Sequence, residues 1–378
     1  MDYYDIKRFD KDDTLVVKGW AIGCMLIHHL FAYPDKIAID FKPISLFKVL
    51  GEPLCQYIGR YGDICVPIFF FLSGYGLMRK FQLTEKKGNI VNPGGWSVVI
   101  DTLKKIYLEY WRVAIVFIPI GFMFFSKQEI YADNAAICTK FNSFSVSELF
   151  KAILGISHFN NEWWFFSSYI VVILTFPLAE RMIRGDFWKC YFGIVIYSIL
   201  NIVVFPWLRD NAFTQLSDDW VYTTFIIQRS KAPLFYLGML FGKCNALEIL
   251  SASLKDTLLK SPFSALVVLI INIPLRISIY GKSTDLIMIP LTIVVTHYIL
   301  SSNKRLKKIF SSLGKHSSVM WMSHSFFCYY FGHVQKIVYM PRLALLIAVW
   351  FVMISWYIAF IFDIFWKSIN KRYKQNSL

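Results

Sequence analysis

The chain has 378 residues, of which 56% are hydrophobic and only 17% are charged, and its mean hydropathy is +0.48. Soluble domains are usually about 45–50% apolar and about 25% charged, so this composition excludes a disordered chain and a soluble globule. The formal net charge of +15 would favour nucleic-acid binding in a soluble protein, but no zinc-finger or RNA-binding motif accompanies it. We therefore expect the partner of this protein to be a lipid bilayer and not a nucleic acid. The basic residues would then mark one side of the membrane.

Ten apolar stretches separated by charged residues predict ten transmembrane helices. A spanning helix needs about 20 mainly apolar residues. The stretches are 15–33, 62–78, 106–125, 163–180, 190–208, 222–242, 263–280, 284–300, 317–333 and 343–366. The sequence thus predicts an all-α polytopic membrane protein that forms a single domain over residues 1–378, with short tails at 1–14 and 367–378.

The distribution of Lys and Arg predicts the orientation of these spans. If the N-terminus is cytoplasmic, the inner segments contain 24 of the 40 basic residues, the outer segments contain 11, and five lie inside spans. Because basic residues collect in cytoplasmic loops, we expect the N-terminus and the C-terminus to be cytoplasmic.

The first span contains three ionisable side chains, Lys18, His28 and His29. Such groups are costly inside a membrane and usually face the bundle interior or a wet cavity. Lys18 and His29 are eleven residues apart, which places them within about 20° around a helix and about 16 Å apart along it. The spacing predicts that both face one cavity, with His28 off that face. The alternative is a snorkelling Lys and a packed His pair.

The second span ends at Arg79 and Lys80 on its predicted cytoplasmic side. Together with Lys18, these cations could form a site for an anionic ligand at the inner face. Alternatively, they are topology anchors only.

The sequence Asn-Asn-Glu-Trp-Trp at 160–164 opens the fourth span at the predicted outer face. Trp at a membrane interface is first an aromatic anchor. Trp with Asn and Glu also suits stacking on a sugar and binding its hydroxyls, which makes Asn161, Glu162 and Trp164 candidate glycan ligands.

Four further charges interrupt the predicted spans. Glu109 and Arg112 are three residues apart, and we expect them to pair on one helix face. Arg276 has no acid nearby in its own segment and needs a partner from another helix. Asp363 is the candidate, provided that the two helices meet.

The ninth span follows Gly314, Lys315 and His316. We expect Ser317 to cap this helix and His324 to lie roughly 11 Å deeper, near the middle of the membrane. For a lone helix His, hydrogen-bonded packing and catalysis are equally plausible roles.

The seven cysteines are scattered and include no Cys-x-x-Cys pair. The spacing predicts neither a zinc site nor a redox motif, so we expect no metal.

Taken in order, four of these elements resemble those of the acyltransferase family 3 membrane proteins, which O-acylate bacterial surface sugars. Lys18 and His29 match the spacing of the family's Arg and His, with Lys in place of Arg. Residues 70–74, Phe-Phe-Leu-Ser-Gly, resemble the second-span element, and residues 229–238 resemble the Arg-to-Leu-Gly element of mid-chain. Residues 313–317 followed by His324 look like the late Leu-Gly-x-x-Ser and His element. The resemblance runs from Lys18 to about residue 330.

The resemblance implies a multi-pass O-acetyltransferase of the bacterial inner membrane. Its donor would be cytoplasmic acetyl-CoA, and its acceptor a hydroxyl of a cell-surface polysaccharide or of the lipid-linked precursor. Lys18, Arg79 and Lys80 would bind the CoA phosphates. His29 would act as general base or carry the acetyl group transiently, with His324 as the rival or partner base.

We expect Asn161, Glu162 and Trp164, together with Arg229 and Arg276, to bind the acceptor. Lys18 keeps the positive charge of the family's Arg but loses its planar fork. Some family members carry a fused extracytoplasmic hydrolase-like domain; we expect none here, so the membrane domain would itself acylate the acceptor. Two other classes stay open, namely a transporter or flippase of a lipid-linked oligosaccharide, which needs no CoA, and a non-catalytic membrane protein.

Overall fold

The computed structural model of this chain consists of helices joined by loops, apart from one short hairpin in its described part. It describes residues 9–34, 43–86, 95–124, 141, 143–156, 159–212, 220–278, 284–330 and 332–376. In the hairpin, β1 (Lys48–Val49) pairs with β2 (Glu52–Pro53) in antiparallel register. The left-handed backbone of Leu50 and Gly51 closes its turn. The predicted all-α class is confirmed.

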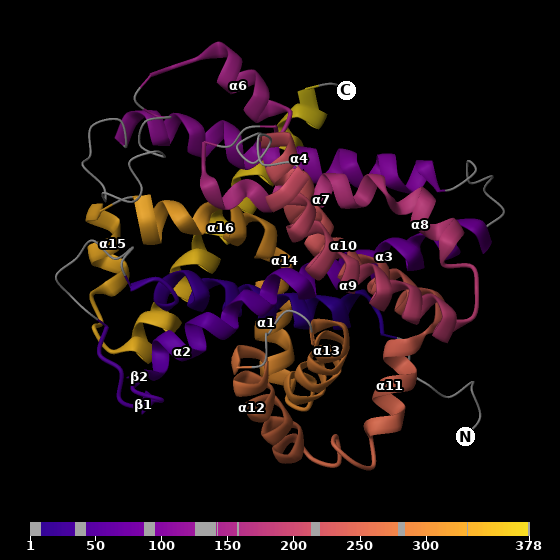
Figure 1. Ribbon diagram of the computed structural model, residues 1–378. Helices are drawn as coiled ribbons and strands as arrows, with labels where there is room; N and C mark the ends of the chain where they lie inside the picture. Colours follow the sequence, from indigo (N-terminus) through magenta and orange to yellow (C-terminus); the bar gives the residue numbers. More distant parts are fainter. Residues whose placement is uncertain are drawn as a thin grey trace.

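The helices follow one another along the chain as labelled in Figure 1. They are α1 (Lys11–Phe31), α2 (Leu54–Tyr61), η2 (Gly62–Ile64), α3 (Cys65–Lys86), α4 (Trp96–Phe124), α6 (Val146–Ile153), η4 (Asn161–Trp163), α7 (Trp164–Leu174), α8 (Phe176–Met182), α9 (Phe187–Ala212), α10 (Trp220–Cys244), α11 (Ala246–Leu254), α12 (Pro262–Ser278), α13 (Asp285–Ser301), α14 (Lys304–Ser325), the π-helix η6 (Phe326–Tyr330), α15 (Gly332–Tyr339) and α16 (Ala344–Asn376).

Each of the ten predicted spans overlaps one or more of these helices. Among the described residues, five helical segments are long and apolar enough to cross a bilayer. They are Lys11–Phe31, Leu54–Lys86, Trp96–Phe124, Phe187–Val204 and Ala344–Ile369. A sixth consists of Asn161–Leu174 and Phe176–Met182, bent by 48°, while α12 and α13 are apolar but shorter. The chain is therefore a multi-pass membrane protein, and the count of ten spans stays a prediction.

The ninth predicted span begins earlier than its composition suggests. Helix α14 starts at Lys304, where the side chain of Asn303 accepts hydrogen bonds from the amides of Arg305 and Leu306. Ser317 is therefore not a cap, and its hydroxyl donates to the carbonyl of Gly314 inside the helix. The prediction of a cap at Ser317 was wrong because polar residues there face a cavity, not a helix start.

Helices α1 and α14 cross so closely that their backbones are in contact. A Cβ added to Gly19 would lie 1.8 Å from the carbonyl oxygen of Phe310, and one added to Gly314 would lie 1.9 Å from that of Leu15. Small residues allow this close approach in a membrane. The two helices run in the same direction, because later residues of α1 meet later residues of α14: His29 lies beside His324.

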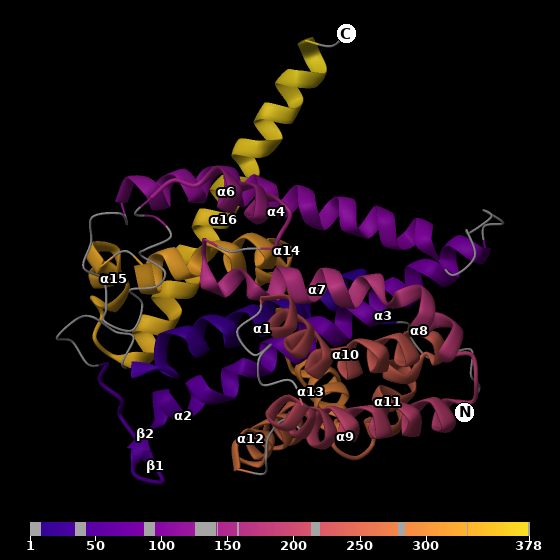
Figure 2. The same cartoon turned by 45° about the horizontal axis from the view of Figure 1, so that its top comes forward.

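A second glycine-mediated crossing joins α3 and α10. A Cβ on Gly74 would lie 2.0 Å from the carbonyl oxygen of Phe235, and one on Gly238 would lie 2.0 Å from that of Phe71. This pair also runs in parallel. Figures 1 and 2 show α1 and α3 near the middle of the bundle, with α4 on one side and α12 and α13 on the other.

Polar contacts fix the start of α1. The side chain of Asp10 accepts a hydrogen bond from the Asp13 amide, and the Asp13 side chain accepts one from the Asp10 amide, which forms a capping box. Asp13 is buried and also pairs with His297 of α13 at 2.9 Å and Lys307 of α14 at 3.3 Å. These contacts fix the position of α1 along its axis relative to α13 and α14.

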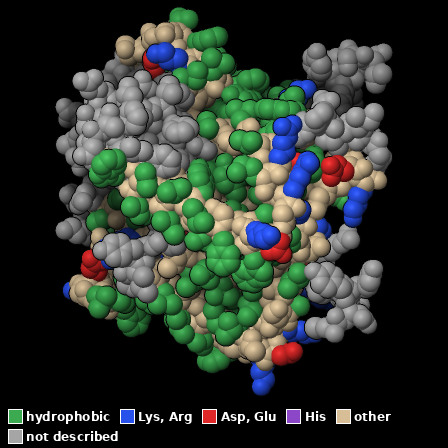
Figure 3. Space-filling model, turned by 45° about the vertical axis from the view of Figure 1, so that its right-hand side comes forward, with side chains coloured by type: hydrophobic (Ala, Val, Ile, Leu, Met, Phe, Trp, Pro, Cys, Tyr) green, Lys and Arg blue, Asp and Glu red, His purple; other side chains and the backbone are tan. Residues whose placement is uncertain are grey.

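The outer surface carries large apolar side chains. Trp188 on α9 is 62% exposed and Leu345 on α16 is 67% exposed, and Figure 3 shows hydrophobic side chains covering much of one face. Large exposed apolar surfaces are rare in soluble monomers and suit contact with lipid. The far end of α16 projects beyond the other helices in Figure 2.

Candidate active site

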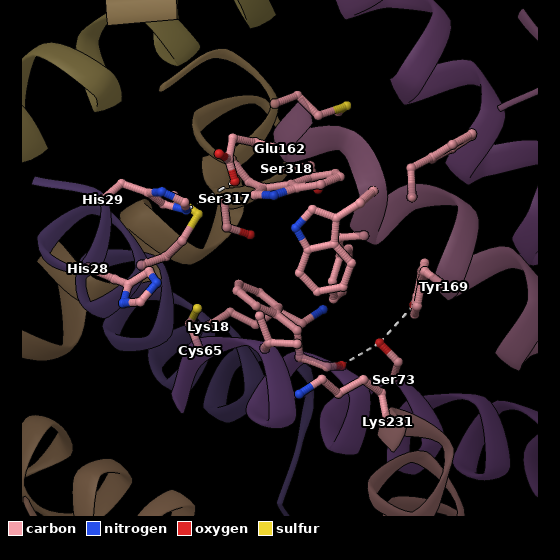
Figure 4. Close-up of a pocket in the computed structure, with 18 of the residues that line it drawn as sticks. Lys18, His28, His29, Cys65, Ser73, Glu162, Tyr169, Lys231, Ser317 and Ser318 are labelled. Atoms are coloured by element: carbon pink, nitrogen blue, oxygen red, sulfur yellow. Dashed lines mark hydrogen bonds and ion pairs between the residues drawn. The ribbon is translucent and has the colours of Figure 1, made fainter. Parts of the chain in front are cut away.

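A cavity of about 650 Å³ lies among α1, α3, α4, α7, α10 and α14 (Figure 4). Along α1 its lining extends from Lys18 to His29, a separation of eleven residues that corresponds to about 16 Å of helix. The hydrocarbon core of a bilayer is about 30 Å thick. The cavity therefore extends over a large part of a membrane's depth.

Lys18 and His29 both line this cavity, as their spacing predicts. His28, which we expected off that face, lines it as well. Its Nδ1 lies 2.9 Å from the carbonyl oxygen of Gly59, and its ring meets the His29 ring edge to face at 5.2 Å. Lys18 and the two imidazoles therefore line the same cavity.

His29 lies between a carboxylate, a hydroxyl and a second imidazole. Its Nε2 is 3.7 Å from Oε2 of Glu162, and the two side chains are only 12% and 13% exposed. Its Nδ1 is 3.0 Å from the hydroxyl of Tyr329, and its ring centroid is 4.5 Å from that of His324. An imidazole with these neighbours has the chemistry of a general base or acid.

His324 lies behind His29 and is not among the described residues that line the cavity. It is fully buried. Its Nδ1 donates a hydrogen bond to the carbonyl of Trp321 at 2.5 Å, while its Nε2 has no hydrogen-bond partner among the described residues. This placement suits support of His29 better than direct contact with a substrate.

The cluster at 160–164 contains residues that line the cavity and a residue with a structural role. Glu162 and Trp164 line the cavity, whereas Asn161 is exposed and is not among the described lining residues. The neighbouring Asn160 is fully buried, donates to the Ser325 hydroxyl at 2.7 Å and accepts from the Glu162 amide at 2.9 Å. Asn160 thus positions Glu162, and the glycan role of Asn161 stays a prediction.

At the Lys18 end, a smaller cavity of about 190 Å³ adjoins the first. Both are lined by Lys18, Ser73 and Tyr169. The Tyr169 hydroxyl donates to the Ser73 hydroxyl at 2.7 Å, which donates to a backbone carbonyl of α3 (Figure 4). These two side chains lie at the junction between the cavities.

Arg79 and Lys80, the two cations at the end of the second predicted span, lie in different surroundings. Lys80 lines the smaller cavity together with Lys18 and lies 3.7 Å from Asp101. Arg79 points elsewhere and donates to the Asn245 side chain at 2.6 Å and to a backbone carbonyl of α10. The structure therefore brings Lys80, but not Arg79, to a cavity that Lys18 shares.

Arg276 is buried between two acids and is not among the described lining residues. Its guanidinium pairs with Asp285 at 2.9 Å and with Asp63, which lines the cavity. The expected partner, Asp363, pairs instead with His316 at 2.7 Å. That expectation was wrong because Asp285 and Asp63 reach Arg276 from α13 and from η2, which pack beside α12.

The remaining intramembrane charges are partly accounted for. Glu109 lines the cavity and pairs with Arg112 at 2.8 Å, as predicted. Lys231 of α10 also lines the cavity. The backbone of Arg229 belongs to α10, but its side chain is outside the described ones, so its binding role stays a prediction.

Three residues of the site escaped the sequence analysis: Asn160, Tyr169 and Tyr329. Asn immediately before a helix is a capping signal and would have favoured Asn160 over Asn161. Tyr169 and Tyr329 carry no local signal, because their partners are 96 and 300 residues away in the chain.

No group of three or more His, Cys, Asp or Glu within the described ranges is arranged to hold a metal ion. The fold and the cavity define a helical membrane protein with a largely buried imidazole–carboxylate site and cations at the Lys18 end of the cavity. The family model described as an acyltransferase domain matches residues 14–363. The chain therefore belongs to acyltransferase family 3 and is a membrane acyltransferase. Comparisons with curated proteins and with solved structures returned no match.

Proposed function

We propose that this acyltransferase moves an acetyl group from cytoplasmic acetyl-CoA to a hydroxyl of a cell-surface polysaccharide or of its lipid-linked precursor. The observation that carries the proposal is one cavity that links Lys18 to the pair of His29 and Glu162. A cavity of this depth would let a donor from one side of the membrane meet an acceptor from the other.

The donor would enter at the inner end. Lys18 and Lys80 would bind its phosphates, since both line the smaller cavity, and Arg79, held by Asn245, would contribute charge at longer range. The thioester arm would pass Ser73 and Tyr169 towards His29.

The acyl transfer would use His29 as general base, because His29 lines the cavity and His324 does not. The Nε2 of His29 accepts the proton of the acceptor hydroxyl while the hydroxyl oxygen attacks the thioester carbonyl. Collapse of the tetrahedral intermediate breaks the carbon–sulfur bond, and the CoA thiolate takes the proton from His29. Glu162 stabilises the imidazolium in between.

The acceptor would lie at the outer end. Trp164 offers a ring for stacking on a sugar, and Asn161 lies at the surface beside it. Arg276 would act on the acceptor indirectly by orienting Asp63, which lines the cavity.

The test is the O-acetyl content of the surface polysaccharide in cells that carry wild type, His29→Ala or the control His297→Gln at matched protein level. We expect loss of acetylation with His29→Ala and retention with the control. Unchanged product with His29→Ala would overturn the assignment of His29. Purified protein that neither binds acetyl-CoA nor releases CoA from it would overturn the proposed function and favour transport.

A further inference from the structure

We propose that Tyr329 is a positioning residue that holds His29 in the tautomer with its proton on Nδ1. The inference rests on the proposed function, in which His29 is the general base. Tyr329 is almost fully buried in η6, and it enters the chemistry through His29.

The hydrogen bonds fix the direction of each proton. The Tyr329 hydroxyl lies 2.7 Å from the His29 carbonyl oxygen and 3.0 Å from the His29 Nδ1. A carbonyl oxygen only accepts, and a hydroxyl has one proton. Tyr329 therefore donates to the carbonyl, and its oxygen accepts the hydrogen of Nδ1.

This arrangement determines which ring nitrogen is the base. With the proton on Nδ1, the neutral imidazole has its lone pair on Nε2, the nitrogen that faces Glu162 at 3.7 Å. In the other tautomer Nε2 already carries a proton and accepts none. The group bonded to one ring nitrogen thus sets the role of the other.

The fold brings Tyr329 to His29 through a wide turn. The α-helix of α14 ends at Ser325, and the chain continues as the π-helix η6, a form that recurs at functional sites. The buried Gln335 donates to the Cys328 carbonyl at 2.7 Å and so helps to hold this turn. His324 next to it also has its Nδ1 bonded, to a main-chain carbonyl, so both neighbouring imidazoles present Nε2.

The chain offers a matched control in Tyr339. Its hydroxyl is buried as well and donates to the carbonyl of Leu30 at 2.9 Å, the residue that follows His29. Tyr339→Phe therefore removes a similar hydroxyl–carbonyl bond from the same end of α1. Tyr329→Phe removes such a bond and also the acceptor of the His29 Nδ1 hydrogen.

The test compares wild type, Tyr329→Phe and Tyr339→Phe as purified full-length chains, with acetyl-CoA and surface polysaccharide from cells that lack this protein. We expect Tyr329→Phe to lower kcat about 10- to 100-fold with the KM for acetyl-CoA within about two-fold. Tyr339→Phe should keep both constants within about two-fold. Equal effects of the two variants on kcat would overturn the inference while leaving the proposed function intact.

Two further outcomes are decisive. No transfer by wild type would sink the proposed function itself, and with it the basis of the inference. If thermal melting shows that Tyr329→Phe does not fold, Gln335→Leu is tested in its place. This variant keeps the Tyr329 hydroxyl but removes the hydrogen bond from Gln335 to the Cys328 carbonyl that helps to hold η6. We then expect kcat to fall several-fold at unchanged KM, and a wild-type kcat would overturn the inference.

Discussion

Gly19 of α1 and Gly314 of α14 each pack on the backbone of the other helix: their added Cβ atoms would lie 1.8 Å and 1.9 Å from a carbonyl oxygen. His29 and His324 each follow ten residues further along their helix. Because the helices run in parallel, this crossing places the two imidazoles at the same depth, with ring centroids 4.5 Å apart.

Alanine in place of Gly19 should disturb this crossing. The new methyl group would press on the Phe310 backbone, which cannot rotate away as a side chain would, so we expect a loss of roughly 1–3 kcal/mol of stability and reduced activity. Thermal melting in detergent and acyl transfer measure both.

Gly23 supplies the control one turn away in the same helix. A Cβ there meets nothing within 4 Å, so Gly23→Ala should stabilise the protein by roughly 0.5–1 kcal/mol through its better helix propensity. Equal melting temperatures for Gly19→Ala and Gly23→Ala would contradict the close crossing.

The sequence predicted the helical membrane fold, because lipid requires long apolar stretches whose positions are visible in composition. It also predicted that Lys18 and His29 share a cavity, since helix periodicity decides which residues share a face. It did not predict where α14 begins: Gly314 suggested a helix start but is a contact with α1.

Contacts between segments that are far apart in the chain could not be predicted from the sequence. Arg276 could be recognised as a buried charge in need of a partner, and Asp285, only nine residues further along the chain, was a nearer candidate than Asp363. Nothing local marks Asp63, 213 residues away, as its second partner. Tyr329 could not be recognised at all, since its role depends on the π-helix η6 and on His29, which is 300 residues away in the chain.

Asn160 and Asn161 are adjacent residues with opposite placements, which makes them a sharp test of how Glu162 is held. Asn160→Ala removes the side chain that accepts from the Glu162 amide and donates to Ser325, so we expect about a 10-fold loss of kcat. Asn161 is exposed. If Asn161 does not bind the acceptor, Asn161→Ala should lower kcat by less than about three-fold. A larger effect from Asn161→Ala, confined to the KM for the acceptor, would support its predicted glycan role.

Lys18 should act on donor binding. Lys18→Ala removes the cation common to both cavities, and we expect the KM for acetyl-CoA to rise about 10-fold, equivalent to about 1.4 kcal/mol. Lys18→Arg keeps the charge and should stay within about three-fold. Lys11→Ala, an exposed change in the same helix, is the control, and an equal effect on KM would refute a specific role for Lys18.

Arg276 tests the interpretation of the buried charges. Its side chain pairs with Asp285 and Asp63 and is 4% exposed. Arg276→Leu would leave both carboxylates without their cation, and breaking a buried pair in this way costs roughly 3–5 kcal/mol. We expect a large drop in melting temperature, and a fall in activity because Asp63 lines the cavity.

Double variants identify the true partners of Arg276. Asp285→Asn added to Arg276→Leu removes one uncompensated charge and should recover part of the lost stability. Asp363→Asn should add its own cost to that of Arg276→Leu, because Asp363 pairs with His316 and distant sites are additive within about 0.5 kcal/mol. Recovery by Asp363→Asn and none by Asp285→Asn would contradict the observed pairing. The contrast works because both changes neutralise one aspartate in the same protein, so a general effect of charge removal would appear equally in each.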